Sequence, residues 1–111
     1  MLPKINRLKK KKDFEHVLKQ GRGLKDGFLS LKFAQNGRDS TRFGFVVGRK
    51  VSSKAVIRNK IKRRLRELAR VRLGEIKKGF DVVVVAGKGA GVENKEATAT
   101  IFNHLIIKLL N

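Results

Sequence analysis

Two segments in the first half of the chain alternate between apolar and polar residues, which predicts β-strands. The first covers residues 28–35 and the second residues 42–48. The turn-rich residues 36–40 lie between them, so we expect a hairpin loop there. In the second strand, three bulky apolar side chains share one face, and the opposite face carries Gly44 and Gly48. Such a face of small residues leaves room for another group to approach.

Two segments before residue 75 have the spacing of amphipathic helices. Residues 13–20 predict a short helix with Asp13 as its N-cap, and its apolar face consists of Phe14, Val17 and Leu18. A longer helix follows Ser52 or Ser53, either of which can cap it, and ends near Gly74. Its apolar stripe is formed by Ile57, Ile61, Leu65 and Leu68.

The C-terminal third predicts a buried strand followed by a helix. Residues 80–86 form a continuous β-branched run, typical of a strand covered on both faces. After a loop at residues 87–91, Asn94 can cap a last helix, with Glu93 and Glu96 near its positive end. The apolar face of this helix would comprise Ala97, Ile101, Phe102, Leu105, Ile106 and Leu109.

These elements follow the order α-β-β-α-β-α and predict an α+β fold, a small sheet packed with helices. A length of 111 residues indicates one domain, residues 1–111. We expect residues 1–12 to be a mobile basic arm. No apolar run approaches the roughly 20 residues that span a membrane, and no secretory signal is recognisable. We therefore expect a cytoplasmic protein without a membrane partner.

The charge of the chain points to a polyanionic partner. Lys and Arg number 28 against 9 Asp and Glu, a net charge of +19. The hydrophobic fraction of 41% is that of a folded domain, so nucleic acid is the expected partner. From Arg49 to Arg72 the only acidic residue is Glu67. An ordinary solvated helix would intersperse more Glu. Asn59 is a poor helix former at such a position, and we interpret it as a hydrogen-bonding residue.

No catalytic centre is apparent in the sequence. His16 and His104 have no partner pattern, and with no cysteine a protein metal site is not expected. The loop at residues 87–91 lacks the spacing of a dinucleotide fingerprint, so we interpret it as presenting Lys88 to phosphate. Phe14 has two readings. It is either a core aromatic, which local context favours, or a platform for stacking an unpaired base.

One motif runs from Phe43 through Arg49-Lys50 to Arg58-Asn59-Lys60, and the Lys62-Arg63 and Arg66-Glu67 pairs follow it. Together they resemble the signature of the bacterial ribonuclease P protein subunit. The resemblance covers nearly the whole chain. It implies a left-handed β-α-β crossover, a hand that general sheet statistics oppose. It also implies a protein that binds a catalytic RNA and helps remove the 5′ leader of precursor tRNA, within an endoribonuclease whose chemistry and Mg²⁺ belong to the RNA.

The resemblance assigns residues to two surfaces. The surface for the catalytic RNA would comprise Arg58, Asn59, Lys60, Lys62, Arg63 and Arg66. The leader cleft, between the first helix and the sheet, would comprise Phe14, Leu18, Arg49, Lys50 and Lys88. Leu18 replaces an aromatic common in the family, and Gly87 replaces a basic residue.

The implied protein is a monomer bound once per catalytic RNA, and it has no organic cofactor. A basic ribosomal protein that binds rRNA is the alternative, and a nuclease active without RNA is a further one.

Overall fold

The computed structural model describes residues 2–91 and 95–110 and is built on one four-stranded sheet. Along the chain the elements are η1 (Lys4–Asn6), α1 (Lys11–Gln20), β1 (Arg22–Asp26), β2 (Leu29–Gln35), β3 (Arg42–Val47), α2 (Ala55–Arg72), η2 (Leu73–Glu75), β4 (Phe80–Ala86) and α3 (Lys95–Leu110). The strands lie in the order β1-β2-β4-β3, so β3 and β1 form the two edges. This α+β architecture confirms the predicted fold class.

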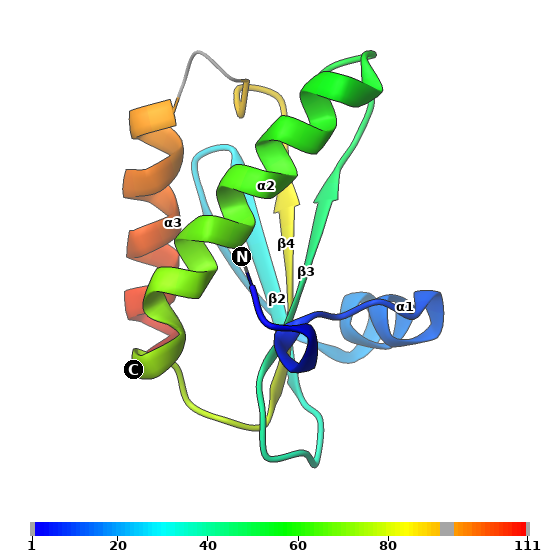
Figure 1. Cartoon of the computed structure of the whole chain (residues 1–111), viewed down its shortest axis with the longest axis vertical. Helices are drawn as coiled ribbons and strands as arrows, with labels where there is room; N and C mark the ends of the chain where they lie inside the picture. The colour runs from blue at the N-terminus through cyan, green and yellow to red at the C-terminus, as the bar shows by residue number, and fades with distance from the viewer. Residues whose placement is uncertain (1, 92–94, 111) are drawn as a thin grey trace.

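The strand pairs show how the chain crosses the sheet. β2 is antiparallel to both β1 and β4, whereas β3 runs parallel to β4. A parallel pair needs a crossover, and α2 provides it. In Figure 1 both strands point upward, α2 lies in front of them, and β4 lies to the left of β3. The crossover is therefore left-handed, as the family resemblance implied and against the general preference.

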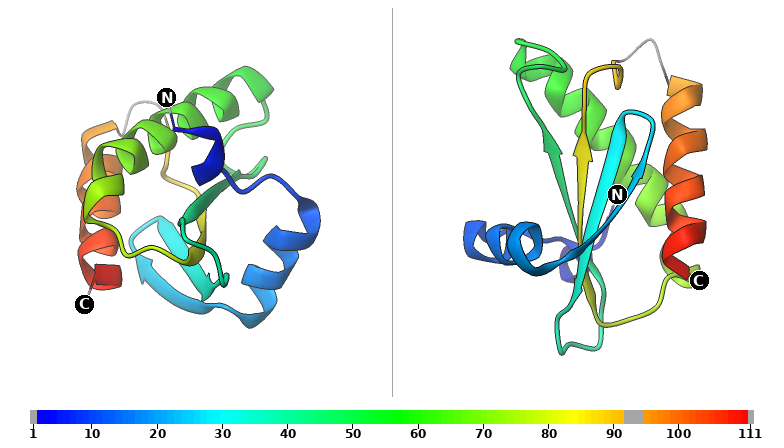
Figure 2. Two further views of the ribbon diagram at one scale, coloured as in Figure 1. Left: turned by 60° about the horizontal axis from the view of Figure 1, so that its bottom comes forward. Right: turned by 180° about the vertical axis from the view of Figure 1, so that it is seen from behind.

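Helices cover the two faces of the sheet unequally. α2 and α3 lie on one face and α1 lies on the other (Figure 2). The larger core, with Phe43, Phe45, Val82 and Val84, faces α2 and α3. A smaller cluster, centred on Val83, faces α1. β4 is thus buried on both faces, which confirms the prediction from its unbroken β-branched run.

Two expectations about strands are wrong. Residues 36–40 do not close a hairpin, because β4 lies between β2 and β3 in the sheet. The hairpin partner of β2 is β1, which the sequence analysis left unassigned. β1 is short, contains Gly23 and lies at an edge with exposed charged residues. It therefore lacks the apolar alternation that identified the other strands.

The N-terminal segment is not a mobile arm in this structure. Leu2 and Leu8 are only 1% and 5% exposed. Leu2 joins the core beneath α2, and Leu8 joins the cluster beneath α1, so the segment wraps around the edge of β3. The Leu8 N–H donates to the Phe43 carbonyl at 2.8 Å. Two buried leucines are enough to anchor the segment. The expectation of a mobile arm rested on its many basic residues and did not take these leucines into account.

The predicted caps of the first two helices are wrong as well. α1 begins at Lys11, so Asp13 lies in its first turn. Lys54, not Ser52 or Ser53, is the N-cap residue of α2, and its side chain makes no capping hydrogen bond. α2 ends at Arg72, two residues before Gly74. The expected cap Asn94 and the nearby Glu93 lie outside the described residues, whereas Glu96 lies in the first turn of α3, as expected.

The expected apolar face of α3 is confirmed at most of its positions. Phe102, Leu105 and Ile106 are fully buried, and Ile101 and Leu109 pack partly buried against the same core. Ala97, by contrast, is exposed.

A bidentate ion pair fixes β3 against β4 at the end nearest α1. The Arg42 Nε and Nη2 atoms donate to the two carboxylate oxygens of Asp81, at 2.8 and 2.6 Å. Asn36 donates to the same carboxylate at 2.9 Å, and Asp13 lies 3.5 Å from Arg42. Burial alone would raise the pKa of Asp81. The hydrogen bonds from Arg42 and Asn36 outweigh it and lower that pKa.

Replacing Asp81 with Asn should lower the free energy of unfolding by about 3 kcal/mol, the typical cost of breaking a buried ion pair. Because the folded-state pKa of Asp81 is lowered, its contribution is present above the unfolded pKa of about 4. It is lost as the pH falls through the folded value. Urea unfolding at pH 7 and at about pH 2 should therefore show a large difference between the wild type and D81N at pH 7 and a small one in acid. An equal difference at both pH values would contradict the assignment.

Candidate nucleic-acid interface

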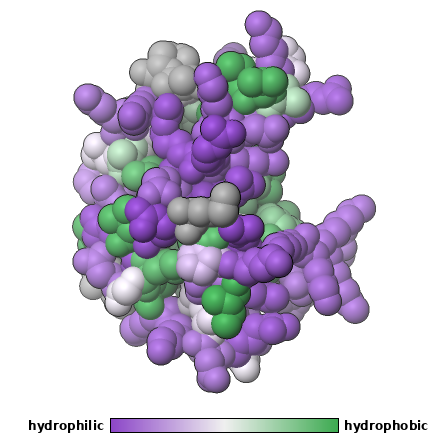
Figure 3. Space-filling model, viewed as in Figure 1, coloured by the Kyte–Doolittle hydropathy of each residue, from purple (hydrophilic) through white to green (hydrophobic). Residues whose placement is uncertain are grey.

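The solvent face of α2 is a cationic surface. The apolar stripe turns inward, with Ile61 and Leu65 fully buried and Ile57 and Leu68 packed against the core. The predicted RNA-binding residues therefore lie outward or along the flanks of the helix. Of these, Asn59, Lys60, Arg63 and Arg66 are exposed, and Arg58 and Lys62 are half-buried. Hydrophilic side chains dominate the face of the molecule that carries α2 (Figure 3).

Local contacts distinguish the residues of this surface. The Arg58 guanidinium donates to the Ser52 carbonyl at 3.0 Å, so it also fixes the loop before α2. Glu67 accepts a hydrogen bond from Arg70 at 2.8 Å, and this bond lowers the pKa of Glu67 and raises that of Arg70. The one acidic residue of the helix thus balances the charge of Arg70. Lys60 and Arg63 lie in the part of α2 before that pair.

Phe14 extends from α1 over the opposite face of the sheet. Its ring lies directly above Gly44, where a Cβ atom would come within 2.4 Å of two ring carbons. The small face of β3 therefore accommodates this ring, which explains the glycine. Phe14 packs against the cluster of Leu8, Val17 and Val83, yet it remains half-buried. The packing reading of Phe14 therefore holds in part, whereas stacking on an unpaired base stays a prediction, for which the half-buried ring leaves some surface accessible.

The other residues assigned to the leader cleft are exposed, but only Leu18 lies on the same helix as Phe14. Leu18 lies on α1 with 37% of its surface exposed, and its carbonyl accepts a hydrogen bond from Lys32 at 2.9 Å. Arg49, Lys50 and Lys88 follow the ends of the parallel strands β3 and β4. Gly44 lies three residues before the end of β3, which corresponds to a distance of roughly 10 Å along the strand. The five residues border an elongated path rather than a single pocket.

Half-buried Val46 and Val85 lie between the two ends of that path, on the face of the sheet that α1 covers. A smaller pocket of about 240 Å³ beside Lys88 includes Ser30 and Val85. Sequence reasoning did not identify Lys32, whose side chain lies on the same face. The alternating pattern only places Lys32 on the strand face opposite Leu29, Leu31 and Phe33 and assigns it no role.

The part of the chain that the structure describes contains no group of three or more His, Asp or Glu side chains placed to hold a metal ion. His104 lies 3.4 Å from Asp26 at the surface, far in sequence from the basic helix. Within the described ranges, no helix is both long and apolar enough to cross a membrane.

Residues 2–110 match the family model described as Ribonuclease P. The chain belongs to the ribonuclease P protein family. The ribonuclease P protein components of Syntrophomonas wolfei and Thermotoga maritima are each 38% identical to it. The alignments cover 86% of this chain and 80% of the first relative, and 94% of this chain and 88% of the second.

Solved structures of family members share the fold. The Staphylococcus aureus RNase P protein superposes with a TM-score of 0.85 at 30% identity, covering 96% of this chain and 98% of that one. The Thermotoga maritima RNase P protein gives a TM-score of 0.76 at 34% identity, covering 92% and 96%. The family acts in tRNA 5′ processing as the protein component of a ribonuclease. Membership in it displaces the ribosomal alternative.

Proposed function

We propose that this ribonuclease P protein binds the catalytic RNA through α2 and the 5′ leader of precursor tRNA through the face beneath α1. The observation that carries the proposal is the placement of two different surfaces on opposite faces of one sheet. The surface on α2 is rich in Lys and Arg and suits a folded RNA, whose phosphates dominate affinity. The other surface presents Phe14, an aromatic ring that can stack on an unpaired base.

The proposed residues are those that the family resemblance assigns, and their exposure and position support them. The contacts to the catalytic RNA come from Arg58, Asn59, Lys60, Lys62, Arg63 and Arg66. Phe14 and Leu18 border the leader path at one end, and Arg49, Lys50 and Lys88 border it at the other. The leader is the part of the substrate that the product lacks. Contacts to it favour precursor over mature tRNA, whereas contacts common to both would not aid turnover.

In this proposal the protein supplies charge and orientation while the RNA carries out the hydrolysis. Lysine and arginine side chains reduce the repulsion between two polyanions, so their benefit is greatest at low salt. The Mg²⁺ ions are held mainly by the RNA, and one protein monomer serves each catalytic RNA. The supporting observation is that α2 offers exposed cations and hydrogen-bond donors, among them Asn59, Lys60 and Arg63.

Cleavage of precursor tRNA tests the proposal directly. With a bacterial ribonuclease P RNA at low Mg²⁺, adding this protein should restore cleavage at the mature 5′ end. Protein without RNA should give no product, which separates this function from that of a self-sufficient nuclease. If the folded protein gives no stimulation with several bacterial ribonuclease P RNAs, the proposed function is wrong.

A further inference from the structure

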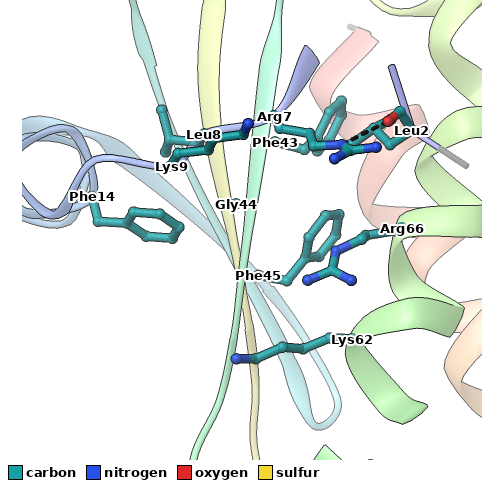
Figure 4. A pocket seen from close by; sticks show the side chains of 10 residues that line it. All are labelled: Leu2, Arg7, Leu8, Lys9, Phe14, Phe43, Gly44, Phe45, Lys62 and Arg66. Atoms are coloured by element: carbon teal, nitrogen blue, oxygen red, sulfur yellow. Dashed lines mark hydrogen bonds between the residues drawn. The ribbon is translucent and has the colours of Figure 1, made fainter. Parts of the chain in front are cut away.

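A pocket of about 410 Å³ lies at the outer edge of β3, between the two proposed RNA surfaces. Phe14 borders it from one face of the sheet and Phe45 from the other, with Gly44 between them (Figure 4). Its volume is within the range of small-ligand sites. Because Gly44 has no side chain, the backbone of β3 itself forms part of the pocket wall. The pocket thus gives access to the strand edge from between two aromatic rings.

Among the residues that the structure describes, four cationic side chains line this pocket and no carboxylate does. Arg7 and Lys9 come from the N-terminal segment, and Lys62 and Arg66 come from α2. Arg7 is held in place because its Nε atom donates to the Leu2 carbonyl at 2.7 Å. Folding therefore gathers like charges from segments more than fifty residues apart, which is unfavourable unless an anion lies among them.

The edge of β3 also offers unpaired backbone groups inside the pocket. Arg7 forms a bridge with Phe43, and within residues 2–91 and 95–110 this is the pairing recorded on that edge. Along a strand, alternate residues direct their N–H and C=O groups to the same side. Since the Phe43 carbonyl points outward to Leu8, the N–H and C=O of Phe45 point outward too, beyond the end of the bridge. An edge strand with free groups is a template for hydrogen bonding.

We infer that this β3-edge pocket binds one unpaired nucleotide of the precursor tRNA leader. Its phosphate would lie nearest Arg7 and Lys9, with Lys62 and Arg66 shared with the adjoining surface for the catalytic RNA, and its base would lie between the Phe14 and Phe45 rings. The edge of the base would exchange hydrogen bonds with the Phe45 backbone. Every base carries a donor beside an acceptor, so the pocket accepts all four bases with little preference. The inference rests on the proposed function. A leader that leaves an RNA bound at α2 crosses the β3 edge on its way to the face beneath α1.

Site-directed cross-linking tests the position of this nucleotide. The natural chain has no cysteine, so Lys9→Cys provides a single attachment point for a photoreactive group. Lys10→Cys is the matched control, because Lys10 is an exposed neighbour that does not line the pocket. In the complex with catalytic RNA and precursor tRNA, position 9 should cross-link to one leader nucleotide, and position 10 should do so far less. Cross-links from position 9 only to the catalytic RNA would overturn the inference.

Affinity measurements test the charge of the same pocket. Lys9→Ala should weaken binding of precursor tRNA by the assembled complex about threefold to tenfold, the loss of one phosphate contact, with a shallower salt dependence. Lys10→Ala should weaken it less. Neither variant should change mature tRNA binding or affinity for the catalytic RNA. Removing single bases from the leader should identify one position whose loss weakens binding, regardless of which base it carried.

Two results separate this inference from the proposed function. If Phe14→Ala weakens the binding of precursor but not of mature tRNA, while Lys9→Ala and Lys10→Ala have equal effects, the leader path stands and the β3-edge pocket does not belong to it. If neither variant affects precursor binding, the leader function itself fails. If an acidic peptide binds at this edge and RNA does not displace it, the pocket belongs to a protein strand, and the inference that it binds a nucleotide is overturned.

Discussion

Replacing Lys60 and Arg63 together with Ala should weaken binding of the catalytic RNA about 30-fold at moderate salt. Both side chains are exposed on α2, and neither takes part in a hydrogen bond or ion pair recorded among the described residues. Two phosphate contacts at about 1 kcal/mol each give that factor. The slope of log affinity against log salt should also become shallower by roughly two contacts. A salt titration of RNA binding measures both quantities.

The matched control removes the same charge elsewhere. Lys77 and Lys78 are exposed in the segment before β4, so Lys77→Ala with Lys78→Ala lowers the net charge equally. That variant should lose far less affinity, since it changes only the long-range field. Equal losses in the two variants would mean that net charge, and not the α2 surface, determines binding. Urea unfolding should show both variants as stable as the wild type.

Replacing Phe14 with Ala should weaken precursor tRNA binding to the assembled complex by about 1–3 kcal/mol, the usual value of one aromatic–base stack. Mature tRNA has no leader, so its affinity should not change. The ratio of precursor to mature tRNA affinity, measured with the same RNA preparation, decides whether Phe14 contacts the leader. A ratio that stays constant would assign Phe14 to packing alone.

Phe14 also packs above Gly44, so its folding role must be separated from binding. Phe14→Leu retains an apolar side chain of intermediate size above Gly44 and Val83 but removes the ring. We expect this variant to unfold close to the wild type and still lose most of the leader discrimination. Leu18→Ala is the neighbouring control, because it shortens an exposed side chain on the same helix. Its effect should be smaller, in keeping with the lack of an aromatic ring there.

The basic helix and the β4 strand could be predicted from the sequence because each is defined by local periodicity. The stripe Ile57, Ile61, Leu65 and Leu68 fixes which side of α2 is buried, and the remaining positions must then be exposed. The fate of Phe14 could not be settled this way. Its exposure depends on Gly44, thirty residues later, whose missing side chain leaves space for the ring.

The sequence by itself determined the α+β class, the cationic face of α2 and the family, because these depend on periodicity, charge and a local motif. Only the tertiary structure decided that β4 lies between β2 and β3, that Leu2 and Leu8 anchor the N-terminal segment, and that Arg42 pairs with Asp81. Each of these contacts joins residues distant along the chain, so no local pattern records it. The β3-edge pocket is of the same kind, since its cations come from two segments that meet only when the sheet is formed.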